Sequence, residues 1–262
     1  MITDGPDSVT TAVLAAALGG KAVLVAGGSG GIGAATARLF AEAGAAVTIT
    51  HRPGKEAEGA AVLKTLPGAG HAHLPLQIDD SASVGALRDA VAARQDRLDV
   101  LVNAAGFTKP VPHADLDALD DDLIDRMFAV NWRGQFAVVR AFAPLLKASG
   151  DGLIVSISSV AALNGAGSSI AYCAAKAGID VMTKSLARAL APAVRVLAVS
   201  PGVVATGFVP GRGEAFNQQA AAATPLRRVA TADDVARAVL ACATHLTFST
   251  GQTIIVDGGR AL

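Results

Sequence analysis

Short apolar runs alternate with longer helical stretches along most of this 262-residue chain. The strand candidates are Ala22–Ala26, Ala46–Thr50, His73–Ile78, Val100–Asn103, Leu153–Ile157, Val194–Ser200 and Thr253–Val256. The helix candidates between them are Ile32–Ala43, Glu56–Leu66, Ser83–Arg94, Asp120–Ala148, Ala171–Leu190 and Thr231–His245. Strands without polar alternation are typical of a sheet covered on both faces, and strand–helix repetition indicates crossover connections. The sequence therefore predicts a doubly wound α/β sandwich of three layers around a seven-stranded, mostly parallel sheet.

The chain has the organisation of a single domain. Its length is within the range of undivided α/β domains, and no Pro/Ser-rich linker interrupts it. We expect residues 1–12 to form a flexible tail and residues 13–262 to form the domain. Residues 205–224 carry glycines and prolines with little apolar periodicity. This segment follows the sixth strand, at the edge where ligands bind in such sheets, so we interpret it as a substrate lid.

Charge and cysteine content exclude several classes of partner. Lys plus Arg and Asp plus Glu both number 22, so neither nucleic acid nor an anionic membrane is an expected partner. Cys173 and Cys242 are predicted to be free thiols in a reducing compartment. The acidic start of the chain lacks a secretory leader, which favours a cytoplasmic location. The aspartates between 115 and 122 are interpreted as a helix N-terminus, and no metal site is expected.

A glycine-rich turn separates the first strand from the first helix. It reads Ala26-Gly27-Gly28-Ser29-Gly30-Gly31-Ile32-Gly33. Glycines permit a tight turn and close approach of backbone amides to a pyrophosphate, and the helix N-terminus adds a partial positive charge. In this position the turn predicts a dinucleotide-binding, Rossmann-like domain. The glycine spacing is G-x-x-x-G-x-G.

Further motifs follow in order along the chain. They are Asn103-Ala104-Ala105-Gly106, Ser159, Tyr172-Cys173-Ala174-Ala175-Lys176, Pro201-Gly202 with Thr206, and Asp257-Gly258-Gly259. With the glycine turn they resemble the short-chain dehydrogenase/reductase family over nearly the whole chain, and in particular its 3-oxoacyl-carrier-protein reductase-like members. The resemblance implies an enzyme that interconverts a carbonyl and a secondary alcohol with a nicotinamide cofactor.

Four residues are predicted to be catalytic: Asn131, Ser159, Tyr172 and Lys176. Tyr172 and Lys176 lie four residues apart and so share one helix face. A tyrosine hydroxyl has a pKa of about 10, and a lysine ammonium one turn away is expected to lower it. By resemblance, Tyr172 exchanges the proton, Ser159 binds the reacting oxygen, Lys176 also holds ribose hydroxyls, and Asn131 holds a proton-relay water. Ser158 is the competing serine, and an ordinary Tyr/Lys helix pair is the alternative to catalysis.

The end of the second strand bears on the choice of cofactor. NAD-preferring relatives usually place an acid at the position of His51, and Arg52 could pair with a 2′-phosphate. NADP(H) is therefore preferred, and NAD(H) stays possible. Gly30 stands at the position where many NADP relatives have a second basic residue. Ala26 stands where the family usually has a threonine. The predicted cofactor contacts are Gly27, Ser29, Gly31, Ile32, Gly33, His51, Arg52, Gln77, Ile78, Asn103, Ala104, Gly106, Tyr172, Lys176, Pro201, Gly202, Val204 and Thr206.

The predicted function is that of an NADP(H)-dependent ketoreductase acting on a small-molecule carbonyl or alcohol. The expected pocket walls, Phe107, residues 160–167 and the lid from Gly207, are small or apolar and favour a lipophilic ketone. Three arginines in or after the lid, Arg212, Arg227 and Arg228, leave room for an anionic group. The alternatives are a 3-oxoacyl-acyl-carrier-protein reductase, a nicotinamide-binding regulatory protein without catalysis, and a dehydratase or epimerase. By resemblance, two long helices and the last strand form interfaces, which implies a homotetramer, with a dimer next.

Overall fold

The structure, a computed structural model, describes residues 17–262, so the tail predicted for residues 1–12 lies outside the described residues. Seven strands form one sheet in the order β3-β2-β1-β4-β5-β6-β7, and every neighbouring pair is parallel. The strands are β1 Ala22–Ala26, β2 Ala46–His51, β3 Ala72–Pro75, β4 Val100–Asn103, β5 Gly152–Ile157, β6 Val194–Pro201 and β7 Thr253–Val256. The predicted doubly wound fold is confirmed. Strand order reverses between β1 and β4, where a ligand crevice forms in such sheets.

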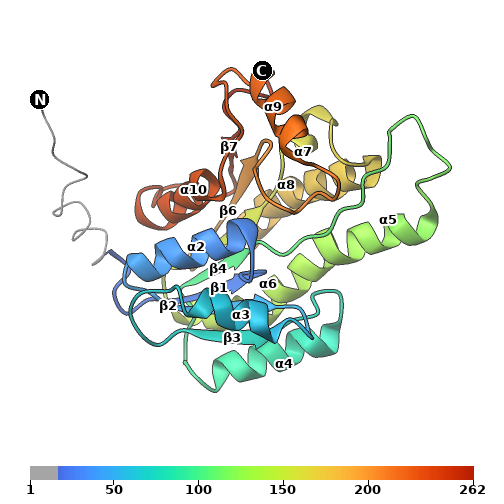
Figure 1. Ribbon diagram of the computed structural model, residues 1–262. Helices are drawn as coiled ribbons and strands as arrows, with labels where there is room; N and C mark the ends of the chain where they lie inside the picture. The colour runs from blue at the N-terminus through green and yellow to red at the C-terminus, as the bar shows by residue number, and fades with distance from the viewer. Residues whose placement is uncertain (1–16) are drawn as a thin grey trace, which may run out of the picture.

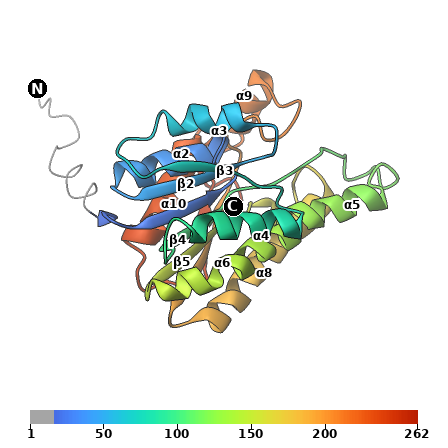
Figure 2. The ribbon, with the colours of Figure 1, turned by 90° about the horizontal axis from the view of Figure 1, so that it is seen from below.

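Helices cover both faces of this sheet (Figures 1 and 2). They are α2 Gly31–Glu42, α3 Glu56–Leu63, α4 Ser81–Ala92, α5 Asp121–Phe128, α6 Gln135–Ala148, α7 Ala161–Asn164, α8 Ile170–Leu190, α9 Glu214–Ala222 and α10 Ala232–Thr244. Figure 2 shows α2, α3 and α10 on one side, with α4, α6 and α8 on the other. Each side has its own core, containing Phe40 and Val239 on the first and Phe142 and Leu101 on the second. Each such buried side chain contributes about 1.5–3 kcal/mol.

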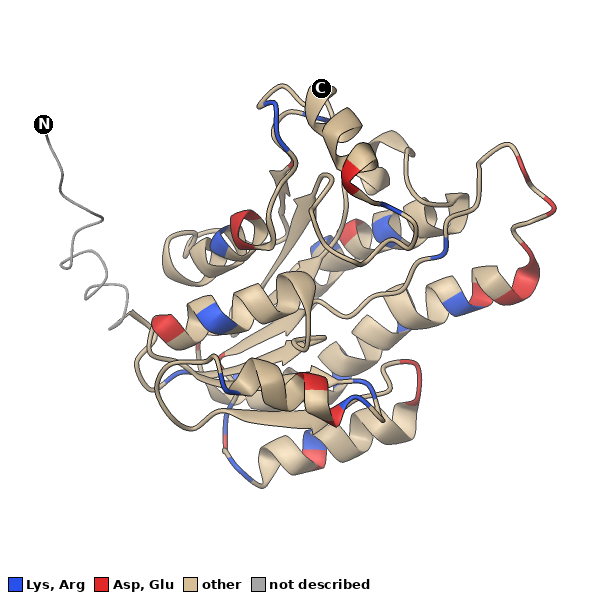
Figure 3. Cartoon of the chain, in the orientation of Figure 1, with Lys and Arg blue, Asp and Glu red and all other residues tan. Residues whose placement is uncertain are grey.

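Acidic and hydroxyl side chains fix where several helices begin. Asp120 caps α5 by accepting from the Leu123 amide at 2.8 Å, and Asp80 caps α4 in the same way. Thr231 and Asp234 form a reciprocal capping box at α10. The red ribbon at the start of α5 in Figure 3 is therefore a capped helix N-terminus. Residues 17–262 contain no group of His, Cys, Asp and Glu suited to a metal ion.

Three elements differ from the sequence-based expectation. β3 ends at Pro75 rather than Ile78, because the Gln77 amide donates to the Ser83 hydroxyl at 2.9 Å instead of to a strand. The helix predicted over 120–148 is interrupted by a π-helical turn, Ala129–Gly134. The segment predicted as an irregular lid contains α9, whose alanines and glutamines are good helix formers.

Two further observations concern the chain as a whole. No helix within residues 17–262 has the length and apolarity that a membrane span requires. Cys173 and Cys242 are both buried and unpaired, as predicted. Burial raises the pKa of both thiols, that of Cys242 to about 11, so they behave as small apolar core residues.

Candidate active site

The four predicted catalytic residues come from three elements that meet beyond the carboxyl end of β5. Ser159 follows β5, Tyr172 and Lys176 lie in the first turns of α8, and Asn131 lies in the π-helical turn. The Ser169 side chain caps α8 by accepting from the Tyr172 amide at 3.2 Å, which fixes where the tyrosine emerges. The Lys176 ammonium lies 5.7 Å from the centre of the Tyr172 ring. The structure therefore brings the predicted residues together.

The Tyr172 hydroxyl does not have the lowered pKa that the sequence predicts. Burial raises its pKa to about 12, against the opposing effects of the Ser159 hydroxyl and the Arg212 charge. Loss of hydration disfavours the phenolate, and the nearby lysine does not offset it in this arrangement. The expectation was wrong because it counted the lysine charge and not the burial. The consequence is a tyrosine that stays protonated at neutral pH.

Lys176 is buried, with 3% of its surface exposed. Its ammonium donates to the Ile157 carbonyl oxygen at 2.7 Å, so the cation is anchored at the end of β5. Burial lowers the pKa of Lys176 to about 8, while the charge of Asp180 acts in the opposite direction. The lysine can therefore lose its charge in the weakly alkaline range.

Asp180 is a residue that the sequence analysis missed. It lies one turn after Lys176 on α8 and accepts from the Thr253 hydroxyl at 3.2 Å. Burial raises the pKa of Asp180. That shift is opposed by the hydroxyls of Ser158 and Thr253 and by the cations of Lys184 and Lys176. The four-residue spacing from Lys176 was the available signal. Ser158 faces this group, since its hydroxyl donates to the Lys176 carbonyl at 3.3 Å, whereas Ser159 lies beside Tyr172.

Asn131 is fully buried, and its side-chain amide has defined partners. Its nitrogen donates to the Phe107 carbonyl at 2.8 Å and to the Met127 carbonyl at 2.9 Å, and its oxygen accepts from the Phe107 amide at 3.0 Å. The side chain thus fixes the loop that follows β4. The surrounding π-helical turn is a local irregularity of a kind often found at functional sites.

The glycine-rich turn is closed by contacts that only glycine allows. A Cβ atom on Gly27 would lie 2.6 Å from the Ala105 backbone, and one on Gly33 would lie 2.1 Å from the Gly27 carbonyl oxygen. The Gly27 amide donates to the Thr50 hydroxyl at 2.9 Å. Thr50 on β2 therefore provides a turn-stabilising hydroxyl that Ala26 cannot.

The same turn presents free hydrogen-bonding groups. Helix α2 begins at Gly31 with no side-chain cap and no acid in its first turn, so its first amides are available to an anion. The methyl group of Thr206 lies 3.6 Å from the Cβ position of Gly31, so the loop after β6 approaches the turn. Asn103 at the end of β4 is buried with both side-chain polar atoms unpartnered. These groups fit a dinucleotide.

The other predicted cofactor contacts are distributed around this crevice. Arg52 is exposed, whereas His51 is only 3% exposed. The centre of the His51 ring lies 5.1 Å from that of His73, and the ring packs against Gly59. The predicted residues Ser29, Ile32, Gln77, Ile78, Ala104, Gly106, Pro201, Gly202 and Val204 lie in the glycine turn or at the ends of β3, β4 and β6. Gln77 is exposed, and its side-chain amide nitrogen already donates a hydrogen bond to the Asp79 carboxylate.

The lid segment lies against the tyrosine. The ring centre of Phe208 is 6.2 Å from that of Tyr172, and ring atoms of Phe208 lie 3.5 Å from the Cβ position of Gly106. Phe208 therefore packs beside the Tyr172 ring and the loop that follows β4. The sequence predicts a lid over residues 205–224 but does not single out Phe208.

Comparisons with known proteins agree with this geometry. A family model described as enoyl-(acyl carrier protein) reductase matches residues 26–261. A cis-4-hydroxycyclohexanecarboxylate dehydrogenase of Sinomonas cyclohexanicum is 39% identical over 244 residues, covering 91% of this chain and 96% of that protein. The chain belongs to the short-chain dehydrogenase/reductase family.

Other members of the short-chain dehydrogenase/reductase family are similar over the same span. The 3-oxoacyl-acyl-carrier-protein reductase of Thermotoga maritima is 34% identical, covering 94% of this chain and 99% of its own. A short-chain type dehydrogenase/reductase of Mycobacterium ulcerans has a TM-score of 0.85 at 29% identity, covering 93% and 90% of the two chains. The chain is therefore an oxidoreductase acting on CH–OH and C=O groups, in a family that uses NAD(P)(H).

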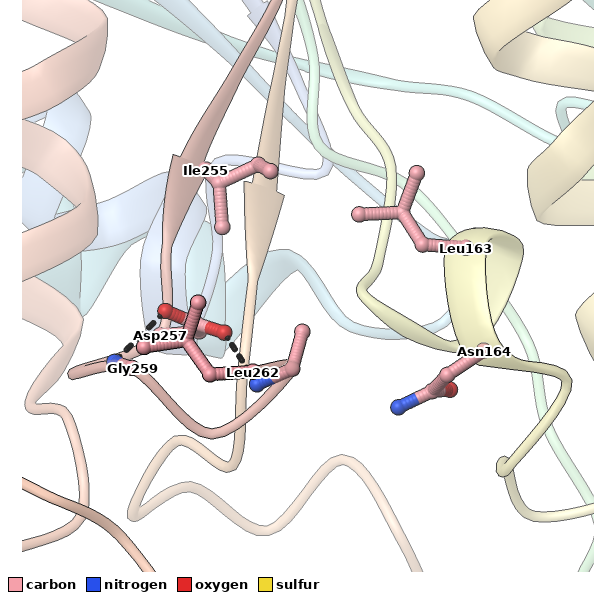
Figure 4. Close-up of a pocket in the computed structure, with 7 residues that line it drawn as sticks. Leu163, Asn164, Ile255, Asp257, Gly259 and Leu262 are labelled. Carbon is pink, nitrogen blue, oxygen red and sulfur yellow. Dashed lines mark hydrogen bonds between the residues drawn. The ribbon is translucent and has the colours of Figure 1, made fainter.

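A separate hollow lies beside the edge strand β7. This cavity of about 280 Å³ is lined by Leu163 and Asn164 of α7, Ile255 of β7 and residues of the C-terminal turn (Figure 4). The Asp257 carboxylate accepts from the Gly259 and Ala261 amides at 2.8 and 2.7 Å, which closes that turn. None of the four predicted catalytic residues lines the cavity, although Leu163 and Asn164 belong to the segment 160–167 that was expected to form a pocket wall.

Proposed function

We propose that this protein is an NADP(H)-dependent ketoreductase that interconverts a ketone and a secondary alcohol. The observation that carries the proposal is the grouping at the carboxyl end of β5. There Tyr172 lies beside the Ser159 hydroxyl and the buried Lys176 ammonium, across the crevice from the glycine turn. Its test is incubation of the purified protein with NADPH and a panel of ketones. Absence of NADPH oxidation, together with absence of NADP⁺-dependent alcohol oxidation, would contradict it.

Each catalytic residue has a role in this mechanism. The cofactor, when bound, supplies the hydride. Ser159 donates a hydrogen bond to the substrate oxygen and stabilises the charge that develops there. Tyr172 transfers its hydroxyl proton to that oxygen as a general acid, and the Lys176 cation stabilises the phenolate that forms. Asn131, whose amide is held by Phe107, would retain the relay water through its backbone carbonyl.

The raised pKa of Tyr172 favours this direction of reaction. With a pKa of about 12 the hydroxyl carries its proton at neutral pH, as a proton donor must. Oxidation of an alcohol requires phenolate instead, so it is expected to need more alkaline conditions.

The binding groups for the cofactor follow from the same surface. The pyrophosphate would be held by backbone amides of the glycine turn, those of Gly27, Ser29, Gly31, Ile32 and Gly33. Arg52 would pair with the 2′-phosphate. Lys176 and Tyr172 would hold the nicotinamide ribose, and the residues after β3, β4 and β6 would enclose the remainder.

Replacement of Arg52 tests the cofactor preference. We expect the protein to bind NADPH more tightly than NADH, and Arg52→Gln to weaken NADPH binding about tenfold or more, because a charge-assisted hydrogen bond is lost. NADH binding should not change. Lys55→Gln is the matched control, since Lys55 is paired with Glu58 at 2.7 Å. Titration by protein fluorescence measures the affinities of all three proteins for both nucleotides. Tighter NADH binding by the unmodified protein would refute the role of Arg52.

A pH profile tests the role of Lys176. Its ammonium is charged below a pKa of about 8 and neutral above it, so ketone reduction should fall as the pH rises through that value. Asp180→Asn removes a charge that raises the pKa of Lys176, so the alkaline limb should move to lower pH. Asp180 is faced by four groups that stay in place in this variant: Lys176, Lys184, Ser158 and Thr253. The control is Asp89→Asn on α4, which removes an acid elsewhere and should not move the alkaline limb of the pH profile. If Asp180→Asn also leaves that limb in place, a group other than Lys176 causes it.

A second activity is supported by relatives that reduce 3-oxoacyl groups on acyl carrier protein. The ketone panel therefore includes a 3-oxoacyl thioester, and mass analysis of products separates reduction from dehydration or epimerisation. A purely regulatory nicotinamide-binding protein is less well supported, because it has no need of the complete Asn131, Ser159, Tyr172 and Lys176 set.

Three broader features belong to the proposal. Residues 205–224 act as the substrate lid over the pocket. The protein works in the cytoplasm. It assembles as a homotetramer, with one interface along the edge strand β7, where Ile255 is 51% exposed beside Leu163 and the hollow of Figure 4. Size-exclusion chromatography with light scattering measures the assembly.

A further inference from the structure

The lid carries a cation as well as the aromatic wall formed by Phe208. Arg212 lies four residues after Phe208, just before α9, and its guanidinium carbon is 4.4 Å from the ring centre of Phe216. Phe216 belongs to α9, so the stacking holds the guanidinium against a formed helix. The arginine is thus positioned by packing even though it is exposed to solvent.

This guanidinium has no acidic partner within the described part of the chain. No carboxylate of residues 17–262 lies within ion-pair distance of Arg212. The nearest acid in sequence, Glu214, accepts instead from the Gln218 amide at 3.3 Å. Other arginines near this end of the molecule are already engaged, as Arg228 is by Asp234. Arg212 therefore keeps its donors for another group.

The position of Arg212 is linked electrostatically to the reacting centre. Arg212 belongs to the same segment as Phe208, whose ring centre is 6.2 Å from that of Tyr172, and its charge lowers the pKa of the Tyr172 hydroxyl. Burial and the charge of Arg260 lower the pKa of Arg212. Arg260 is itself fixed, because it donates to the Ala220 carbonyl of α9 at 3.0 Å. Arg212 and Arg260 therefore repel each other, and an anion bound by Arg212 would relieve that repulsion.

We infer that the substrate of this site is a ketone with a carboxylate close to its carbonyl group, and that Arg212 binds this carboxylate. The inference rests on the proposed ketoreductase function. A guanidinium matches a carboxylate with two parallel hydrogen bonds. Phe208 and Phe107 then enclose an apolar body between the carboxylate and the carbonyl. The phosphate of a carrier-protein arm lies at the far end of a long chain, so it does not meet a cation this close to Tyr172.

Matched pairs of substrates test the inference. They are 3-oxobutanoate, 4-oxopentanoate and 5-oxohexanoate, each compared with its methyl ester. The ester keeps the ketone and the carbon chain and removes the charge. With NADPH, the unmodified protein should reduce at least one acid with kcat/KM about tenfold or more above that of its ester.

The Arg212→Met variant separates the charge from the packing. Methionine can still pack on Phe216, so the lid should keep its structure. We expect this variant to lose the preference for the acid, mainly through KM, and to reduce the ester as the unmodified protein does. Arg212→Lys keeps a charge and should retain part of the preference. Arg237→Met, at an exposed position on α10, is the control and should retain all of it.

The outcomes distinguish this inference from the proposed function. Reduction of esters as efficient as that of every acid, or an unchanged preference in Arg212→Met, would overturn the role of Arg212 while leaving ketone reduction established. Failure to reduce any ketone or ester would contradict the proposed function itself.

Discussion

Replacement of Tyr172 by phenylalanine should reduce kcat for ketone reduction by about 10³-fold or more, because the change removes the proton donor and little else. General acid catalysis commonly contributes about 10²- to 10⁴-fold. The phenylalanine ring keeps the contact with Phe208, and the Tyr172 amide still binds the Ser169 cap. Stopped-flow measurement of NADPH oxidation at saturating ketone determines the loss.

Nucleotide binding provides the control for this prediction. Tyr172→Phe should bind NADPH within a few fold of the unmodified protein and melt at a similar temperature, since the ring stays in place. A variant that binds normally and keeps more than a tenth of kcat would show that another group donates the proton. Ser159→Ala should lose about 10²-fold, as expected for one donor at a developing oxyanion.

The sheet and most of the site could be predicted from local patterns. Buried parallel strands require apolar, β-branched runs, so the seven strands and their crossover helices appear directly in the sequence. Gly27, Gly28 and Gly33 of the turn are required by contacts that a side chain would block. Ser159, Tyr172 and Lys176 were located by the resemblance of their spacing to the family's motifs, since a Tyr/Lys pair four residues apart is common on helices.

Long-range contacts account for what the sequence did not show. Thr50 compensates for Ala26 from the neighbouring strand, and no local pattern connects the two. The pKa of Tyr172 depends on how deeply the lid and the neighbouring loops bury it, so spacing from Lys176 predicted the wrong direction. The π-helical turn carries Asn131, whose side chain bonds Phe107, a residue 24 positions away in the sequence. Helix α9 was missed because its apolar side chains are alanines except for Phe216, which leaves no repeated pattern of large apolar residues.

Replacement of Gly33 by alanine should strongly weaken both nucleotide binding and folding. Its Cβ would lie 2.1 Å from the Gly27 carbonyl oxygen, so the backbone of the turn must shift. Overpacking of this kind costs about 1–3 kcal/mol of unfolding free energy, or roughly 2–10 °C in Tm for a chain of this size. Because the shifted amides no longer converge on one pyrophosphate, NADPH should bind at least about tenfold more weakly.

Gly30 in the same turn is the matched control. Its backbone is extended, with a φ of −170°, and its Cβ position has no atom within 4 Å. Gly30→Ala should therefore change the unfolding free energy by no more than about 0.5 kcal/mol and leave the NADPH affinity nearly unchanged. Calorimetric titration and thermal melts compare the two variants. If both bind NADPH as tightly as the unmodified protein, the turn does not hold the pyrophosphate. If only Gly33→Ala fails, close packing of the turn is what makes its amides a binding site.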